Sequence, residues 1–240
     1  MSTTVKPTPV EEWLSKSQEP EAPTGASLRV TVVYGSSKGE SNAASWLAKD
    51  ILEAIGSEMP GRLQVAEFHL PDMKIAPCYN CYGGGGHACA YPCDRNDVEH
   101  KLYDKDDEMP KIHERLIEGD VLIIAADSRW GGLNNFVQRF LERMNPFPAQ
   151  VALDKPALHN KVACLAVVGD SPMPVVGQLM TALNASGFAF PCYGYVAWNI
   201  PRMASKESVK AAFEKSTAVH NDVSLVAADL VRFAKLLKGV

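Results

Sequence analysis

The chain has 240 residues, a hydrophobic fraction of 46% and a formal net charge of -4, from 24 basic and 28 acidic residues. A balance this mild argues against nucleic acid or an anionic membrane surface as a partner, and no apolar run approaches the roughly 18 residues that cross a bilayer. The amino terminus has no basic patch followed by an apolar stretch, so we expect no signal peptide and a cytoplasmic location.

The first 27 residues differ in composition from the rest of the chain. They are polar and contain prolines at positions 7, 9, 20 and 23, which is typical of a tail and not of a packed element. We therefore predict a polar tail over residues 1–27. The remaining length suits one domain over residues 28–240, with a cysteine- and glycine-rich insertion at residues 77–105.

Five short apolar segments of this domain alternate with segments of helical periodicity. In chain order, the expected strands are residues 29–35, 63–70, 120–126, 162–168 and 188–197. The expected helices are residues 44–55, 106–117, 133–144, 175–186 and 205–237, the last with a break near residues 216–217. Apolar strands that alternate with helices indicate an α/β fold, in which helices cover both faces of a parallel sheet.

This architecture also indicates where a ligand would bind. In open parallel sheets, ligands bind beyond the carboxyl ends of the strands, at the point where the strand order reverses. Three loops directly follow strands and are therefore candidate ligand-binding loops, at residues 35–42, 127–132 and 169–172.

The first of these loops has the composition of a phosphate site. It reads Gly-Ser-Ser-Lys-Gly-Glu-Ser-Asn from residue 35 to residue 42 and opens a helix, where free backbone N–H groups and the helix dipole attract an anion. Hydroxyl and amide donors and a single lysine suit one terminal monophosphate. Neither the P-loop nor the dinucleotide glycine motif is present. The alternative is a polar turn whose serine only caps the helix.

A second segment, together with this loop, resembles a known family. It reads Ser-Arg-Trp-Gly-Gly at residues 128–132 and precedes an amphipathic helix that ends in Glu-Arg-Met at residues 142–144. Both features resemble the flavodoxin-like NADPH-dependent FMN reductases, near the branch of the iron–sulfur flavoproteins, over about residues 29–198. The resemblance implies a flavodoxin-like, doubly wound, five-stranded parallel sheet of strand order 2-1-3-4-5 with helices on both faces.

The resemblance also implies which residues bind FMN. The phosphate would be held by the first loop, at Ser36, Lys38, Ser41 and Asn42. The ring and ribityl chain would lie against the two later loops, at Asp127, Ser128, Arg129, Trp130, Gly131, Gly169, Asp170 and Ser171.

The second of these loops departs from the family pattern. The family commonly has Thr-Pro followed by an aromatic residue, whereas this chain has Ala-Asp-Ser-Arg at residues 126–129. Arg129 could stabilise negative charge on reduced FMN at the N1–C2=O edge, or it could form a structural ion pair with Asp127 or Asp170. Trp130 could stack on the flavin ring or belong to the core.

Four of the six cysteines form a cluster in the insertion. The cluster consists of Cys78, Cys81, Cys89 and Cys93. Thiolates at this density hold zinc or a four-iron cluster, but related iron–sulfur motifs place the third cysteine where this chain has Gly84. Zinc, an iron–sulfur cluster and a metal-free loop therefore stay open. Cys164 and Cys192 lie in apolar segments, where we expect small buried thiols.

Three functions are compatible with these features. The first is an NAD(P)H-dependent FMN oxidoreductase that passes a hydride through the flavin to a small-molecule acceptor, namely a quinone, a nitro or azo compound, or free flavin. The flavin carries that chemistry, so no catalytic side chain is required. The second is an iron–sulfur flavoprotein that carries electrons to a protein partner. The third is a flavodoxin-fold binding protein that has lost FMN. We further expect a homodimer or homotetramer.

Overall fold

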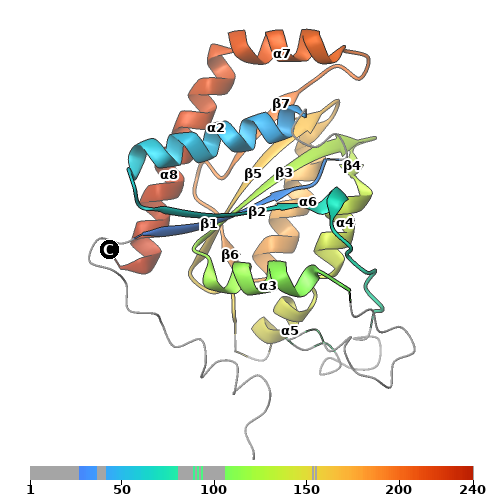
Figure 1. Ribbon diagram of the computed structural model, residues 1–240, viewed down its shortest axis with the longest axis vertical. Helices are drawn as coiled ribbons and strands as arrows, with labels where there is room; N and C mark the ends of the chain where they lie inside the picture. Colours follow the sequence, from blue (N-terminus) through green and yellow to red (C-terminus); the bar gives the residue numbers. More distant parts are fainter. Residues whose placement is uncertain are drawn as a thin grey trace, which may run out of the picture.

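A parallel sheet with helices on both faces forms the centre of the computed structural model (Figure 1), which describes residues 27–36, 42–80, 89, 91, 93, 106–152, 154 and 156–239. The main strands are β1 (Leu28–Tyr34), β2 (Leu63–His69), β3 (Val121–Arg129), β5 (Lys161–Gly169) and β6 (Phe188–Ala189). They lie side by side in the order β2-β1-β3-β5-β6. This confirms the doubly wound, flavodoxin-like order, with its switch point between β1 and β3.

The central strands are buried on both faces, which explains their continuous apolar sequences. Neighbouring residues of β3 show the pattern, since Ile123 packs into one core and Ile124 into the other. The first core lies under α2 (Ala43–Glu58), α7 (Lys206–Lys215) and α8 (Thr217–Lys238). The second lies under α3 (Met109–Glu118), α4 (Asn135–Glu142), α5 (Pro146–Ala152) and α6 (Pro172–Ala185), and Figure 1 shows the two groups of helices on opposite sides of the sheet.

The strand expected at residues 188–197 is not continuous. Its first part is β6, which pairs with the beginning of β5, and its second part is β7 (Tyr195–Asn199), which pairs with the carboxyl half of β5. Five residues separate the two pieces, whereas only Ala163 and Cys164 separate their partners on β5. The extra residues must leave the sheet, and Pro191 among them has no N–H for the ladder. β7 also runs two residues beyond the expected end.

Other expected boundaries are confirmed by the local hydrogen bonds. The long C-terminal helix breaks at Ser216, whose hydroxyl accepts a hydrogen bond from the Val219 N–H and so caps α8. Three short elements were not expected, namely β4 (Gly132–Leu133), α5 and the single 3-10 turn η2 (Leu70–Asp72). In the described part of the chain, no helix combines the length and apolar character needed to span a bilayer.

Candidate functional site

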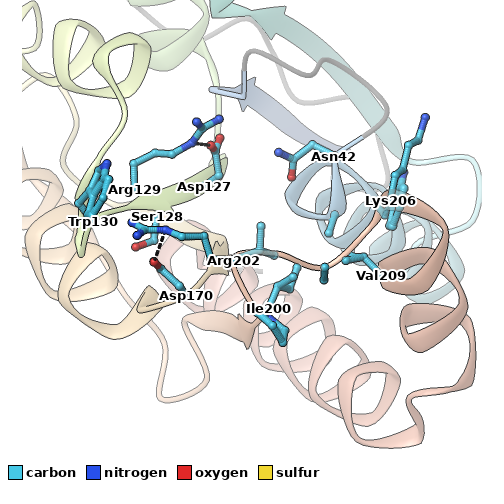
Figure 2. A pocket seen from close by; sticks show the side chains of 16 residues that line it. Asn42, Asp127, Ser128, Arg129, Trp130, Asp170, Ile200, Arg202, Lys206 and Val209 are labelled. Atoms are coloured by element: carbon cyan, nitrogen blue, oxygen red, sulfur yellow. Dashed lines mark hydrogen bonds and ion pairs between the residues drawn. The ribbon is translucent and has the colours of Figure 1, made fainter.

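A cavity of about 570 Å³ opens at the carboxyl ends of β3, β5 and β7 (Figure 2). The first residues of α2 and α7 complete its wall. Among the residues expected at the site, the cavity is lined by Asn42, Asp127, Ser128, Arg129, Trp130, Gly169 and Asp170. The sheet thus brings together three loops that are far apart in the sequence, at the edge where parallel sheets bind ligands.

The side of the cavity next to β1 is built from the ends of the first loop. Asn42 caps α2, with its Oδ1 accepting a hydrogen bond from the Ala44 N–H at 2.7 Å, and its Nδ2 donates to the hydroxyl of buried Ser36. Gly35 precedes Ser36, and a Cβ at Gly35 would collide with Cγ2 of Val137. Lys38 and Ser41 lie outside the described residues, so their predicted role in phosphate binding stays a prediction.

A buried carboxylate fixes the start of the second loop. Asp127 is 6% exposed, and its Oδ2 accepts a hydrogen bond from Nε of Arg129 at 2.8 Å. Its Oδ1 accepts a second one from Nδ2 of Asn134 at 3.0 Å. Asn134 in turn caps α4 through its Oδ1. Arg129 therefore forms the ion pair with Asp127 that was one of its two expected roles, while its side chain remains 52% exposed at the cavity.

Trp130 occupies the tip of a tight hairpin between β3 and β4. Trp130 and Gly131 have φ angles of 55° and 72°, and they join the pairs formed by Ser128 with Leu133 and by Arg129 with Gly132. Two positive φ values are typical of a type I′ turn, which favours asparagine and glycine; a tryptophan in this conformation costs about 1–2 kcal/mol. The Trp130 side chain is 84% exposed, so the interpretation as a core residue is wrong.

Arg202 spans the mouth of the cavity between two of its walls. Its guanidinium carbon lies 3.5 Å from the centroid of the Trp130 ring, and its Nε lies 3.3 Å from Oδ2 of Asp170 (Figure 2). The other carboxylate oxygen of Asp170 is buried and has no hydrogen-bond partner in the described part of the structure. Asp170 is thus paired with Arg202 and not with Arg129.

The loops after β3 and β5 approach each other too closely for a side chain at Gly169. Its φ is +145°, and a Cβ there would lie 2.8 Å from both Cβ and the carbonyl oxygen of Ser128. The Ser128 hydroxyl donates to the Ser171 carbonyl at 2.7 Å. Ser36, Gly131 and Ser171 do not line the cavity, although each is adjacent to a residue that does or is bonded to one.

The sequence of this chain matches one family over most of its length. Residues 28–200 fit the family described as NADPH-dependent FMN reductase. The chain belongs to this family. It is accordingly an FMN-dependent and NAD(P)H-dependent oxidoreductase. No curated protein sequence matches this reductase significantly.

Solved structures share the fold of this reductase at low sequence identity. RosB with a bound 8-demethyl-8-formylriboflavin-5'-phosphate intermediate has a TM-score of 0.63 and 16% identity, over 89% of this chain and 81% of RosB. The NADH:FMN oxidoreductase EMOB in its apo form has a TM-score of 0.53 and 16% identity, over 87% and 89% of the two chains. The azoreductase AzrA has a TM-score of 0.51 and 12% identity, over 88% and 100%.

The cavity of this reductase fits an FMN molecule. Its volume of about 570 Å³ lies within the roughly 300–1,000 Å³ usual for organic ligands. The first turn of α2 begins at its wall, where backbone N–H groups favour a phosphate. The unpartnered, buried Oδ1 of Asp170 is an acceptor available to a ligand N–H or O–H group.

Sequence reasoning missed the part of the wall that follows β7. This part consists of Ile200, Pro201, Arg202, Ala204, Lys206 and Val209. The strand expected at residues 188–197 ends two residues before β7 does, so the sequence does not mark residues 200–209 as part of a strand-end site. An Arg immediately after an Ile-Pro pair at the end of the last strand was the available signal. Trp46 of α2 also lines the cavity and was not expected.

The described residues do not support a metal centre at the cysteine cluster of this reductase. Cys81 lies outside the described residues, and within them no group of three or more Cys, His, Asp or Glu side chains is placed to hold a metal ion. The Sγ of Cys78 instead accepts hydrogen bonds from the Asn80 N–H at 3.5 Å and from Nδ2 of Asn145 at 3.6 Å.

The two remaining cysteines have different environments. Cys164 is buried in β5 as expected, and this burial raises the pKa of its thiol to about 12, so it stays protonated at neutral pH. Cys192 is exposed, which contradicts the expectation of a buried thiol. The reason is that the residues between β6 and β7 leave the sheet, as described above.

A buried arginine ties both ends of the insertion to α4. Arg143 is 1% exposed and donates to the Ala76 carbonyl at 2.9 Å, next to the first residue of the insertion, and pairs with Asp107 at 2.7 Å, just after its last. The carbonyl of Arg143 accepts a hydrogen bond from Nε2 of His113 at 3.0 Å. Burial, followed by the charge of Arg143, lowers the pKa of His113 to about 3, so this imidazole is neutral and donates through Nε2.

Proposed function

We propose that this reductase transfers a hydride from NAD(P)H, by way of FMN, to a small planar acceptor such as a quinone, a nitro or azo compound, or free flavin. One observation carries the proposal. The cavity lies at the carboxyl ends of β3, β5 and β7, beside the first turn of α2, and is open at a mouth flanked by Trp130 and Arg202. A flavin held there would have an accessible face for two planar partners in turn.

Two groups of residues would hold the cofactor. The phosphate group would bind to Ser36, Lys38, Ser41 and Asn42, of which Ser36 and Asn42 are joined by a hydrogen bond. The ring and ribityl chain would lie against residues 127–131 and 169–171, where Gly169 leaves room for a close approach to Ser128. FMN supplies the redox chemistry when it is bound.

The side chains of this chain orient the reactants and set the charge of the site. Asp127 holds Arg129 by its Nε, so the rest of the guanidinium is positioned by an ion pair at the edge of the cavity. A cation fixed in this way would stabilise negative charge on a reduced flavin. Both roles considered for Arg129 are thus compatible. No side chain needs to donate or accept a proton in the hydride step.

We also propose that the reductase is a homodimer or homotetramer in which a second subunit covers the cavity mouth. Two large apolar side chains next to this mouth, Trp130 and Met203, are 84% and 92% exposed, and exposed apolar groups beside a site favour a protein partner. Light scattering at micromolar concentration should give a mass of at least two chains, and a monomer with full activity would contradict this assignment.

The function is tested first on protein purified without oxygen. We expect a two-banded flavin spectrum that bleaches on addition of NADPH and returns when naphthoquinone is added, with neither iron nor zinc in stoichiometric amount. The Asn42→Ala variant should lose most of its FMN, because it removes a cap and a side-chain hydrogen bond at the phosphate loop. Ser208→Ala, which changes an exposed hydroxyl on α7, is the matched control.

Two results would favour the other functions. Colourless protein that takes up no FMN would support the binding protein without flavin. Broad absorbance beneath the flavin bands, with bound iron, would support the iron–sulfur electron carrier and make the clustered cysteines its ligands.

A further inference from the structure

We propose that Arg202 and Trp130 select planar aromatic acceptors that carry a carboxylate or sulfonate directly on the ring. In this proposal Trp130 contacts the ring of the acceptor and Arg202 binds its anionic group. The inference rests on the proposed function, since it names the class of acceptor that the same cavity receives.

The first support is the position of Trp130. Its backbone adopts a positive φ that tryptophan rarely takes, at the tip of a two-residue turn where asparagine or glycine is usual. The side chain stays 84% exposed and therefore gains little from burial. Strained residues without a packing role are typical of functional positions. The turn holds the indole of Trp130 at the cavity mouth, in contact with Arg202.

The second support is the way in which Arg202 is held. Its guanidinium carbon lies 3.5 Å from the indole centroid and its Nε lies 3.3 Å from Asp170, so it is anchored by an aromatic face and by a carboxylate (Figure 2). The side chain is nevertheless 47% exposed. A guanidinium has five N–H donors, and one ion pair leaves others for an incoming anion.

The third support is the charge of the cavity wall. Its lining contains two carboxylates, Asp127 and Asp170, and each pairs with one arginine. Lys206 also lines the cavity, and in the described residues its amino group forms no ion pair. Among the described residues that line the cavity, cations therefore exceed carboxylates by one, Lys206, on the side that follows β7. Such a wall attracts anionic ligands.

The short distance between Arg202 and Trp130 indicates what kind of anion fits. The guanidinium covers one face of the indole, so an acceptor ring that contacts the indole beside it would have the guanidinium at its own edge. A carboxylate or sulfonate attached to that ring reaches the guanidinium, in the bidentate geometry that arginine favours. The phosphates of a nicotinamide nucleotide are separated from its ring by a ribose and fit this arrangement less well.

The experiment compares naphthoquinone with naphthoquinone sulfonate as acceptors for the FMN-loaded, full-length reductase with NADPH as donor. The measured quantity is the ratio of kcat/KM for the sulfonate to kcat/KM for the neutral quinone. Comparing this ratio between variants cancels the different intrinsic reactivities of the two quinones. In Arg202→Met we expect the ratio to fall about tenfold or more, as for loss of one charge-assisted hydrogen bond.

Three further measurements make the test specific. Arg202→Lys keeps the charge but loses the planar fork, so its ratio should lie between those of wild type and Arg202→Met. Arg232→Met removes an exposed arginine of α8 that does not line the cavity, and its ratio should equal that of wild type. In the wild type the ratio should fall as the salt concentration rises, because salt screens the attraction, and in Arg202→Met this dependence on salt should be weaker.

The donor is varied in a parallel series with neutral naphthoquinone as the fixed acceptor. NADPH is compared with the uncharged N-benzyl dihydronicotinamide. If Arg202→Met changes the preference between these donors and leaves the acceptor ratio at its wild-type value, the proposal is wrong and Arg202 binds the nucleotide. An acceptor ratio that is equal in wild type and both Arg202 variants, and independent of salt, overturns it as well.

Failure of the proposed function would look different from failure of this inference. Wild-type protein that binds no FMN, or that reduces neither quinone, contradicts the oxidoreductase mechanism itself. Flavin content is therefore measured for every variant, and the ratios are compared only per bound flavin.

Discussion

A methyl group added at Gly35 is expected to damage both the stability of the fold and the binding of FMN. Gly35 follows β1, donates a hydrogen bond to the Ala125 carbonyl at 2.9 Å and leads directly into the phosphate loop. In Gly35→Ala, the new Cβ would overlap Cγ2 of Val137 on α4 and lie 3.3 Å from the Ala125 carbonyl oxygen. Either α4 or the loop must therefore move.

The size of the effect follows from the packing around Val137. This side chain is fully buried, so an extra methyl against it should cost about 1–3 kcal/mol of unfolding free energy. Val137→Ala alone leaves a cavity and should cost about 2 kcal/mol. In the double variant the methyl introduced by Gly35→Ala fills part of the space left by Val137, so its cost should be about 1–2 kcal/mol below the sum of the two single costs.

Urea unfolding of the apoprotein gives the four stabilities of this cycle, and fluorescence titration gives the four dissociation constants for FMN. We expect Gly35→Ala to weaken FMN binding by about tenfold, which corresponds to about 1.4 kcal/mol, and Val137→Ala to restore part of that loss. Additive stabilities, or wild-type FMN affinity in Gly35→Ala, would refute the close contact between β1 and α4 as the reason for glycine at this position.

Two further predictions concern buried polar side chains near the site. The pKa of His113 is lowered to about 3 in the folded protein, so the unfolded chain takes up the proton at a higher pH than the folded protein does. The contribution of His113 to the free energy of unfolding is therefore at its maximum above about pH 6.5. Below that pH the free energy of unfolding should fall by about 1.4 kcal/mol for each pH unit. His113→Gln should flatten this slope in urea unfolding between about pH 7 and pH 5, and parallel slopes would contradict the assignment. Asn134→Ala removes the cap of α4 and should cost about 1–2 kcal/mol, whereas Asn134→Asp keeps the cap. Both variants lose the Nδ2 donor to Asp127, so both should bind FMN more weakly than wild type, and wild-type FMN affinity in Asn134→Asp would show that this hydrogen bond does not support the site.

The central strands were predictable because one physical pattern determines them. Residues 121–126 are buried on both faces of the sheet. The strand therefore appears in the sequence as an unbroken apolar run, which is typical of a buried strand in a parallel sheet. The break before α8 was predictable for a similar reason, since Ser216 is a residue type that caps helices.

The last strand was not predictable in the same way. Residues 188–197 are also apolar, but their division into β6 and β7 depends on the register with β5, which the sequence does not display. The pairing of Arg129 with Asp127 and of Arg202 with Asp170 has the same origin. The sequence left Arg129 two carboxylates as partners, Asp127 and Asp170, and only the relative placement of the loops decides between them.

The strand register also explains how one site can combine a constant cofactor with a variable acceptor. Ser128 pairs with Gly169, and Gly169 with Asn199, so hydrogen bonds between strands fix the starting points of the loops that follow β3, β5 and β7. Residues 127–131 and 169–171 lie next to these fixed points, where precise placement of a flavin is possible. Arg202 lies three residues beyond the last pair, on a segment that the ladder does not hold. Substitutions at Arg202 should therefore change which acceptor is used while the flavin remains bound, whereas substitutions at Gly35 or Gly169 should affect the flavin itself.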